Sequence, residues 1–211
     1  AFTNNGQVFL YNEITDRFEL YHNIVRSTGI DYLVINNLYT NGDTHWAATT
    51  AGLFYLKGDK IVRISRDDTR DIIPYKNNKL LLAKNNQILV LDSDSQTETP
   101  IYTNTTENPF IIFTMHYDAL NDQLWVGTAS SGLYCYDFTT KKMNAFNNQN
   151  FPKQLILAIE STSENSLLVG FDGQGLWEID KKTTKIKQVY LENPDDNNSL
   201  IGNGVYDILC E

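Results

Sequence analysis

Five basic side chains lie in polar segments between the short apolar runs of this sequence. They are Arg26, Arg66, Arg70, Lys84 and Lys153. Together with Asp172, which lies in a Gly-rich segment, they form the set of candidate ligand-binding residues. Guanidinium and ammonium groups bind anionic oxygens, so the set could bind an anionic sugar. Alternatively, the cations only balance Asp67, Asp68 and Asp71, because neighbouring Arg and Asp side chains often do no more than solvate a turn.

Groups typical of catalysis are scattered along the chain. The three histidines lie in separate strand-like segments, without an HExxH motif or a paired His/carboxylate spacing, and are predicted to be ordinary strand residues. A glycoside hydrolase needs two carboxylates about 5 to 10 Å apart in one cleft. Asp71 and Asp172 are the candidate pair. The Gly cluster at 170–175 is predicted to be a turn rather than a phosphate site.

Neither a metal nor a cofactor is expected. The oxygen-rich segments 92–95 and 193–199 lack the spacing of an EF-hand and are predicted to be solvated turns. Cys135 and Cys210 lie far apart in apolar runs, which indicates neither a zinc site nor a disulfide scaffold. Both are predicted to be buried thiols.

The charge balance excludes some partners. The 211 residues include 17 Lys and Arg against 26 Asp and Glu, giving a formal net charge of −9. Nucleic-acid binding needs clustered cations that neutralise phosphates, so no nucleic-acid partner is expected. No apolar stretch approaches the roughly 18 to 20 residues of a membrane span, so this segment is not expected to insert into a membrane. The first residues also lack the pattern of a signal peptide.

The candidate residues must be positioned by strands. The chain contains 12 Tyr and 10 Phe, and its apolar runs are short. Aromatic and β-branched residues favour strands. No apolar stripe with helical spacing continues over three turns, so an all-β fold is predicted.

One pattern recurs along the chain. Segments 124–143 and 167–186 share two apolar residues, Val-Gly, a polar turn, Gly-Leu-aromatic, and then Asp with a Thr/Lys turn. Weaker copies lie at 45–61, 79–97 and 3–18. The aligned turn residues, spaced by 45, 35, 45 and 43 residues with an average of 42, are Gln7, Gly52, Gln87, Gly132 and Gly175. Four strands in a repeat of this length are typical of a β-propeller blade.

The predicted fold is therefore a β-propeller of four-stranded antiparallel blades of about 42 residues. We name the strands of each blade A to D from the central axis outwards. The chain is predicted to be a fragment of a larger propeller, with a partial blade at 1–29, blades at about 30–70, 71–109, 110–153 and 154–192, and the start of the next blade at 193–211, whose A strand covers 205–211.

Two residue types have predicted structural roles within the blades. Positive φ angles are expected at the B–C turn glycines, which are Gly52, Gly132 and Gly175. Large aromatic side chains fill the space between adjacent sheets. Packing between blades, rather than ligand contact, is therefore expected for Trp46, Trp125 and Trp177.

The ligand surface of a propeller is usually built by its D–A loops and B–C turns, because these vary while the strands hold them rigidly. The expected D–A loops are 26–31, 66–71, 104–109 and 147–153. The expected B–C turns are 49–51, 84–86, 129–131 and 172–174. All six candidate ligand-binding residues lie in these segments.

Two segments carry a family resemblance. NPDDNNSLIGNGVYDILCE (193–211) resembles the start of a blade in the two-component regulator propeller repeats, with its Asn-rich loop, Ser-Leu and Val-x-x-Ile. LWVGTASSGLYCYD (124–137) is similar to the core of the same repeat. The resemblance covers essentially the whole chain and is weakest over 71–100.

The resemblance implies the periplasmic sensor region of a hybrid two-component histidine kinase of the Bacteroidetes type. Such a propeller is non-catalytic, and it binds an oligosaccharide or relays its binding to control transcription of polysaccharide-use genes. The implied partners are the remaining blades and domains of an inner-membrane receptor, which is a homodimer. This segment contains no kinase or receiver motif. The alternatives are a propeller enzyme acting on glycans, as a lyase or hydrolase, and a protein-interaction scaffold.

Overall fold

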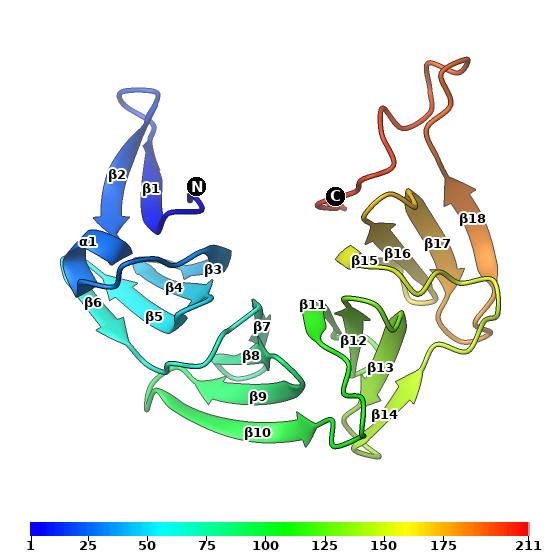
Figure 1. The fold of residues 1–211 in the computed structure, drawn as a ribbon, viewed down its shortest axis with the longest axis horizontal. Coiled ribbons are helices and arrows are strands. Elements are labelled where there is room, and N and C mark those ends of the chain that lie inside the picture. Colours follow the sequence, from blue (N-terminus) through cyan, green and yellow to red (C-terminus); the bar gives the residue numbers. More distant parts are fainter. Residues whose placement is uncertain (211) are drawn as a thin grey trace. The chain divides into compact units, whose positions relative to one another are not determined.

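A computed structural model describes residues 1–210 of the chain (Figure 1). The chain divides into two compact units, the first spanning Ala1–Ile101 and the second beginning at Tyr102, so the division falls within strand β10. Nearly all regular structure is strand. The predicted all-β class and the predicted four-stranded antiparallel sheets are confirmed.

The first unit holds a hairpin, one helix and two four-stranded sheets. The hairpin joins β1 (Gln7–Asn12) to β2 (Arg17–Asn23), and helix α1 (Ile24–Thr28) follows it. The first four-stranded sheet contains β3 (Ile35–Asn41), β4 (Thr44–Thr49), β5 (Gly52–Lys57) and β6 (Lys60–Arg63). The second contains β7 (Asp71–Tyr75), β8 (Lys79–Lys84), β9 (Gln87–Asp92) and β10 (Thr97–Thr103).

The second unit holds two more sheets of the same kind. One contains β11 (Ile112–Asp118), β12 (Gln123–Thr128), β13 (Leu133–Asp137) and β14 (Lys142–Ala145). The other contains β15 (Ile156–Ser163), β16 (Ser166–Phe171), β17 (Leu176–Asp180) and β18 (Ile186–Tyr190). In every four-stranded sheet the strands are neighbours in chain order. Strands one to four of each sheet therefore correspond to A to D.

A repeated polar turn closes the hairpin between strands C and D. The side chain of Asp137 accepts hydrogen bonds from the backbone N–H groups of Thr139 and Thr140, both at 2.8 Å. Asp180 bonds in the same way to Lys182 and Thr183, at 3.0 and 2.7 Å. Asp side chains favour such turns because they satisfy backbone donors locally. The Asp of the repeat is thus a turn residue.

Burial in each unit is concentrated between its adjacent sheets. In the first unit, Trp46 of β4 is 2% exposed and packs with Leu80 and Leu82 of the next sheet. In the second, Trp125 of β12 is 3% exposed and packs with Ile156 and other residues of the following sheet. The predicted packing role of these two tryptophans is confirmed, because large aromatic rings bury enough area to join two sheets.

The Val-Gly step of the repeat allows the segment that follows the sheet to pack closely against it. A Cβ atom on Gly127 would lie 2.7 Å from Cγ2 of Ile156 in β15. A Cβ atom on Gly170 would lie 2.8 Å from Cγ1 and the backbone oxygen of Val205. Both distances are shorter than van der Waals contact, so only glycine allows the following segment to approach β12 or β16 this closely.

The B–C turns require left-handed glycines, as predicted. The φ angles are 119° at Gly52, 83° at Gly132 and 73° at Gly175. We expect Gly52→Ala to lower the free energy of unfolding by about 2 to 4 kcal/mol, combining backbone strain with overpacking. Its Cβ would lie 2.0 Å from the Ser65 carbonyl oxygen. Urea denaturation measures the change.

The matched control is Gly58→Ala. Gly58 also has a positive φ, of 52°, but a Cβ there would meet nothing within 4 Å. Its cost should be about 1 kcal/mol, that of the left-handed backbone alone. Equal losses at the two positions would show that the approach of Ser65 does not matter.

The structure differs from the sequence predictions at three places. The segment 26–31 was expected to be a loop, but α1 covers its first residues, since the side chain of Asn23 caps the helix start and Gly29 ends it with a φ of 68°. Cys210 is exposed rather than buried, whereas Cys135 is half-buried. The predicted strand 205–211 is not a strand over 205–210. Residue 211 lies outside the described residues.

The first residue of this predicted strand nevertheless follows the repeat. The Val205 N–H donates to the Phe171 carbonyl at 3.0 Å, at the end of β16. Ahead of β7, the Thr69 N–H donates in the same way to the Thr49 carbonyl at the end of β4, also at 3.0 Å. Val205 therefore occupies the position that residue 69 has before an A strand.

Candidate functional site

The first unit contains four of the six candidate ligand-binding residues. Arg26 is exposed on α1, and Arg66 is exposed in the loop between β6 and β7. Arg70, in the same loop, is partly exposed and its Nη2 lies 2.7 Å from Oδ2 of Asp68. The charge of Arg70 is therefore already balanced by the neighbouring acid.

Lys84 has a different environment, because its side chain is only 3% exposed. Its Nζ donates to Oε2 of Glu98 at 2.5 Å and to Oγ of Ser65 at 2.7 Å. The Ser65 hydroxyl donates in turn to Oε1 of Glu98 at 2.9 Å. Lys84 thus joins its own sheet to the loop after β6, and its ammonium group is directed inwards.

The nominated hydrolase carboxylates belong to different units. Asp71 is 5% exposed, and its Oδ1 accepts hydrogen bonds from Nδ2 of Asn37 at 2.6 Å and from the Ile72 N–H at 2.8 Å. It therefore joins β7 to β3 within the first unit. Asp172 is exposed on the turn between β16 and β17 of the second unit.

The B–C turns and the segments before the A strands meet at one edge within each unit. In the first unit the Thr69 N–H donates to the Thr49 carbonyl at 3.0 Å. In the second, the Asp172 N–H donates to the Leu155 carbonyl at 3.0 Å. The strands between these loops hold them in place, so a ligand at this edge would meet preorganised groups.

A groove of about 390 Å³ opens at this edge of the second unit. It is lined by residues 131–134, 145–149 and 151–153, and we call it the loop groove. Its volume lies within the roughly 300 to 1,000 Å³ typical of small-molecule sites. The exposed Lys153 is the one charged side chain among its lining residues.

Hydrogen bonds shape the turn on one side of the loop groove. The Thr128 hydroxyl donates to the Gly132 carbonyl at 2.7 Å and accepts from the Ser131 N–H at 2.9 Å. Gly132 lies beneath the opposite loop, where an added Cβ would come within 3.5 Å of the Pro152 carbonyl oxygen. The turn and the loop therefore pack directly against each other.

The loop on the other side is anchored to the core and to the next sheet. The ring of Phe151 packs edge-on against those of Phe146 and Phe171, with centroids 4.8 and 5.4 Å apart. Nδ2 of Asn148 donates to the Thr184 carbonyl at 2.9 Å. These contacts fix the 147–153 loop.

The lining of the loop groove suits a hydroxyl-rich ligand. Asn147 and Gln149 contribute side-chain amides, which both donate and accept hydrogen bonds, whereas the amide of Asn148 already bonds to the Thr184 carbonyl and the Asn150 N–H. Tyr134 contributes an aromatic ring, stacked on Phe110 with centroids 4.3 Å apart. Lys153 adds a cation for a ligand carboxylate or sulfate.

Of the six candidates, only Lys153 lines the loop groove. The sequence pattern placed the two loops but not Tyr134 or Phe146, since strand aromatics were assigned to packing. The sequence signal for Tyr134 and Phe146 is that these aromatic residues flank the two polar segments of the groove.

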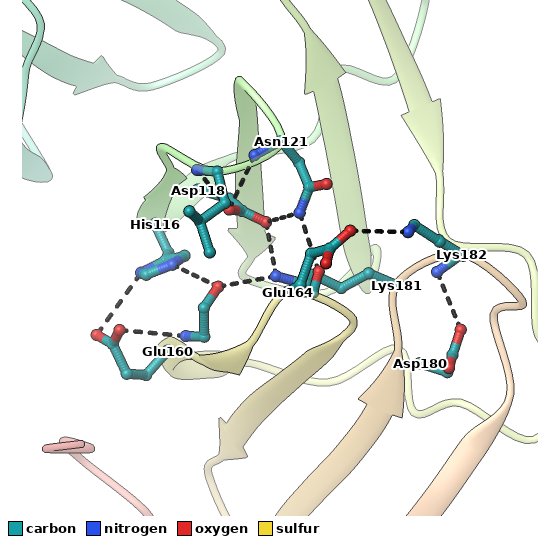
Figure 2. A network of polar contacts seen from close by, with 10 residues as sticks. His116, Asp118, Asn121, Glu160, Glu164, Asp180, Lys181 and Lys182 are labelled. Atoms are coloured by element: carbon teal, nitrogen blue, oxygen red, sulfur yellow. Dashed lines mark hydrogen bonds and ion pairs between the residues drawn. The ribbon is translucent and has the colours of Figure 1, made fainter. Parts of the chain in front are cut away.

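A buried polar network lies at the opposite edge of the second unit (Figure 2). Nζ of Lys181 lies 2.6 Å from Oδ2 of Asp118, and their side chains are 2% and 1% exposed. Nδ2 of Asn121 donates to the same carboxylate oxygen at 2.8 Å. Nε2 of His116 lies 2.8 Å from the Ser161 hydroxyl, which also accepts from Lys181 at 3.3 Å. The network joins β11 to β15 and to the turn after β17.

Burial and charge determine the protonation of this network. Burial opposes ionisation of Asp118, but hydrogen bonds from Lys181 and Asn121 outweigh it and hold the pKa of Asp118 below its usual value. Burial lowers the pKa of His116, and the nearby Glu160 and Asp118 offset this only in part. Asp118 is therefore ionised at neutral pH, and His116 is neutral.

The free energy of unfolding should fall as the pH drops below about 6.5. Burial lowers the pKa values of both His45 and His116 below their unfolded value, so the unfolded chain binds protons more readily over this range. We expect the double substitution His45→Gln/His116→Gln to flatten the slope, as measured by urea denaturation between pH 7 and pH 5. An unchanged slope would contradict the assignment.

Neither a family model nor a curated protein matches this sequence. Solved structures do resemble the chain. Two of them are of the extracellular domain of BT4673 from B. thetaiotaomicron, with TM-scores of 0.76 and 0.75 and 19% sequence identity. The two matches cover 98% and 97% of this chain, and each covers 28% of the BT4673 chain. BT4673 is assigned to a one-component system in one case and to a hybrid two-component system in the other.

Two further structures share the architecture. The extracellular domain of BT3049 from the same organism, assigned to a hybrid two-component system, has a TM-score of 0.55 at 12% identity and covers 97% of this chain and 33% of that chain. The WD40 β-propeller domain of Doa1 has a TM-score of 0.60 at 12% identity and covers 84% of this chain and 57% of that chain. The fold is therefore propeller-like, and the chain spans less than a third of the BT4673 domain. Within residues 1–210, no helix is long and apolar enough to cross a membrane.

Proposed function

We propose that this chain is part of the non-catalytic, extracytoplasmic sensor propeller of a hybrid two-component histidine kinase. The observation that carries the proposal is the similarity of nearly the whole chain to extracellular domains assigned to hybrid two-component systems. The family resemblance of segments 124–137 and 193–211 agrees with it, although no family model matches the sequence. In this proposal the sheets are blades of a larger propeller, located in the periplasm as part of a homodimeric inner-membrane receptor.

The proposed signal is an oligosaccharide that carries an anionic group, and the loop groove is its binding site. Amides and an aromatic ring suit sugar hydroxyls and ring faces, and Lys153 suits the anion. A ligand signals only if it prefers one arrangement of the receptor over another. Binding in the groove would bias the receptor and so control transcription of polysaccharide-use genes.

Isothermal titration calorimetry with neutral and uronic-acid oligosaccharides tests the proposal. Because a hydrogen bond to a charged group contributes about 1.5 to 3 kcal/mol, Lys153→Ala should weaken binding of an acidic oligosaccharide about tenfold to a hundredfold. Lys142→Ala is the matched control, since Lys142 is exposed on β14 of the same sheet but does not line the groove.

The ligand should be recovered intact after titration. Shortened or unsaturated products would instead favour a glycan hydrolase or lyase. Equal affinities of the Lys153 and Lys142 variants would remove the loop groove as the site, and silence across the panel would favour the interaction scaffold.

A further inference from the structure

A pocket of about 230 Å³ lies in the first unit, at the edge formed by the A–B and C–D turns. One sheet contributes residues of β3, β4 and β5 to it, and the next sheet contributes the turns after β7 and β9. We call it the aromatic pocket. Its lining residues are Tyr39, Asn41, Thr44, Trp46, Tyr55, Lys57, Asn78, Ser93 and Asp94.

Three aromatic side chains form one row across a sheet face. Trp46 pairs with Tyr39 of β3 on one side and with Tyr55 of β5 on the other. Directly paired residues project from the same face of a sheet. The Tyr55 ring meets the Trp46 ring edge-on, with centroids 4.9 Å apart. Trp46 is buried and both tyrosines are partly exposed, so the row forms the floor of the pocket, whose accessible surface is mostly polar.

Polar side chains at the rim are held in place by the turns. Asn77 and Asn78 have φ angles of 54° and 56°, as expected for a tight hairpin turn with two left-handed residues. Nδ2 of Asn78 donates to Oδ1 of Asp94 at 3.2 Å. Nζ of Lys57 lies 3.1 Å from Oδ1 of Asp43. Lys57 and Asp94 contribute one charge of each sign to the lining, and Asp43 already balances the charge of Lys57, so no unpaired cation faces the pocket from its lining residues.

A comparison of the two units shows why space remains here. The strand register makes Asn41 the counterpart of Asp118, and Ser93 the counterpart of Lys181. In the second unit the long Lys181 side chain reaches back to Asp118 and fills this position. In the first unit a serine and an amide stand there, and the pocket is open.

We propose that the aromatic pocket binds a neutral, hydroxyl-rich ring of the size of one hexose. A volume of about 230 Å³ is below the roughly 300 to 1,000 Å³ of sites for larger ligands, which fits a single ring. The hydroxyl groups of such a ring bond to the amide and hydroxyl groups that dominate the accessible lining, and its apolar face meets the two partly exposed tyrosines. The site is separate from the loop groove and does not require the sensor role.

The test uses ¹H–¹⁵N NMR spectra of the chain with methyl α-glucoside, methyl α-galactoside, methyl α-mannoside and N-acetylglucosamine. The chain has three tryptophans, so each indole N–H reports on its own environment. At least one sugar should shift the Trp46 indole signal and leave those of Trp125 and Trp177 unchanged. No Trp46 shift with any of the four sugars at about 50 mM, well above a millimolar dissociation constant, would overturn the proposal.

Two variants test the location. Asn78→Gly removes the amide and keeps the left-handed turn, and it should weaken binding at least fivefold, whereas Asn77→Gly in the same turn should change it less than twofold. The double substitution Asn41→Asp/Ser93→Lys copies the pair of the second unit and should abolish the Trp46 shift. Persistence of the shift in the double variant would overturn the proposal. Lys153→Ala should leave the Trp46 shift unchanged, so this test is separate from that of the loop groove.

Discussion

Lys181→Met is expected to lower the free energy of unfolding by about 3 to 5 kcal/mol, because it leaves the buried carboxylate of Asp118 without its charged partner. The two side chains are 2% and 1% exposed, and their N–O distance is 2.6 Å. Urea denaturation followed by tryptophan fluorescence measures the loss. The double substitution Lys181→Met/Asp118→Asn should recover at least about 1 kcal/mol, since it removes the uncompensated charge while an amide oxygen can still accept hydrogen bonds in the turn.

The next residue in the chain provides the matched control. Nζ of Lys182 lies 3.1 Å from Oε1 of Glu164, but these side chains are 61% and 63% exposed. Water screens such a pair, so Lys182→Met should cost less than about 1 kcal/mol. Equal losses for the two methionine variants would contradict the importance of burial.

Trp125→Ala is also expected to cost about 3 to 5 kcal/mol, through lost burial and the cavity that the indole leaves. Trp125 is 3% exposed and packs in one cluster with Ile156, Leu167 and Val169 of the following sheet. The loss should appear in the urea midpoint and in faster hydrogen exchange of β12 and β15, because both strands adjoin the cavity.

Trp177 provides the comparison for this substitution. It lies on β17, packs at the side of the same cluster and is only partly buried. Its Nε1 donates to the Gln174 carbonyl at 2.8 Å. Trp177→Ala should therefore cost less than Trp125→Ala. A larger loss of stability at Trp177 would contradict the expectation that the more deeply buried tryptophan stabilises the protein more.

Local sequence chemistry determined most of the secondary structure. The alternation of apolar residues and the Gly, Asn and Asp turns are local signals, so the strands, the four-stranded sheets and the left-handed glycines could be predicted. The same signals missed α1, where an Asn cap and a Gly stop enclose only five residues. So short a helix has no apolar period to detect.

The edge shared by the loops around Lys153 also follows from the sequence, because the strand order of antiparallel hairpins requires it. Which candidate side chains are accessible depends instead on contacts between sheets. Lys84 and Asp71 are in loop-edge segments like Lys153, yet contacts with Glu98 and Asn37 direct them inwards. The aromatic pocket was likewise hidden, since it depends on whether a serine or a lysine faces it from the next sheet. Burial and pairing between sheets arise from residues far apart in the chain, and no local pattern encodes them.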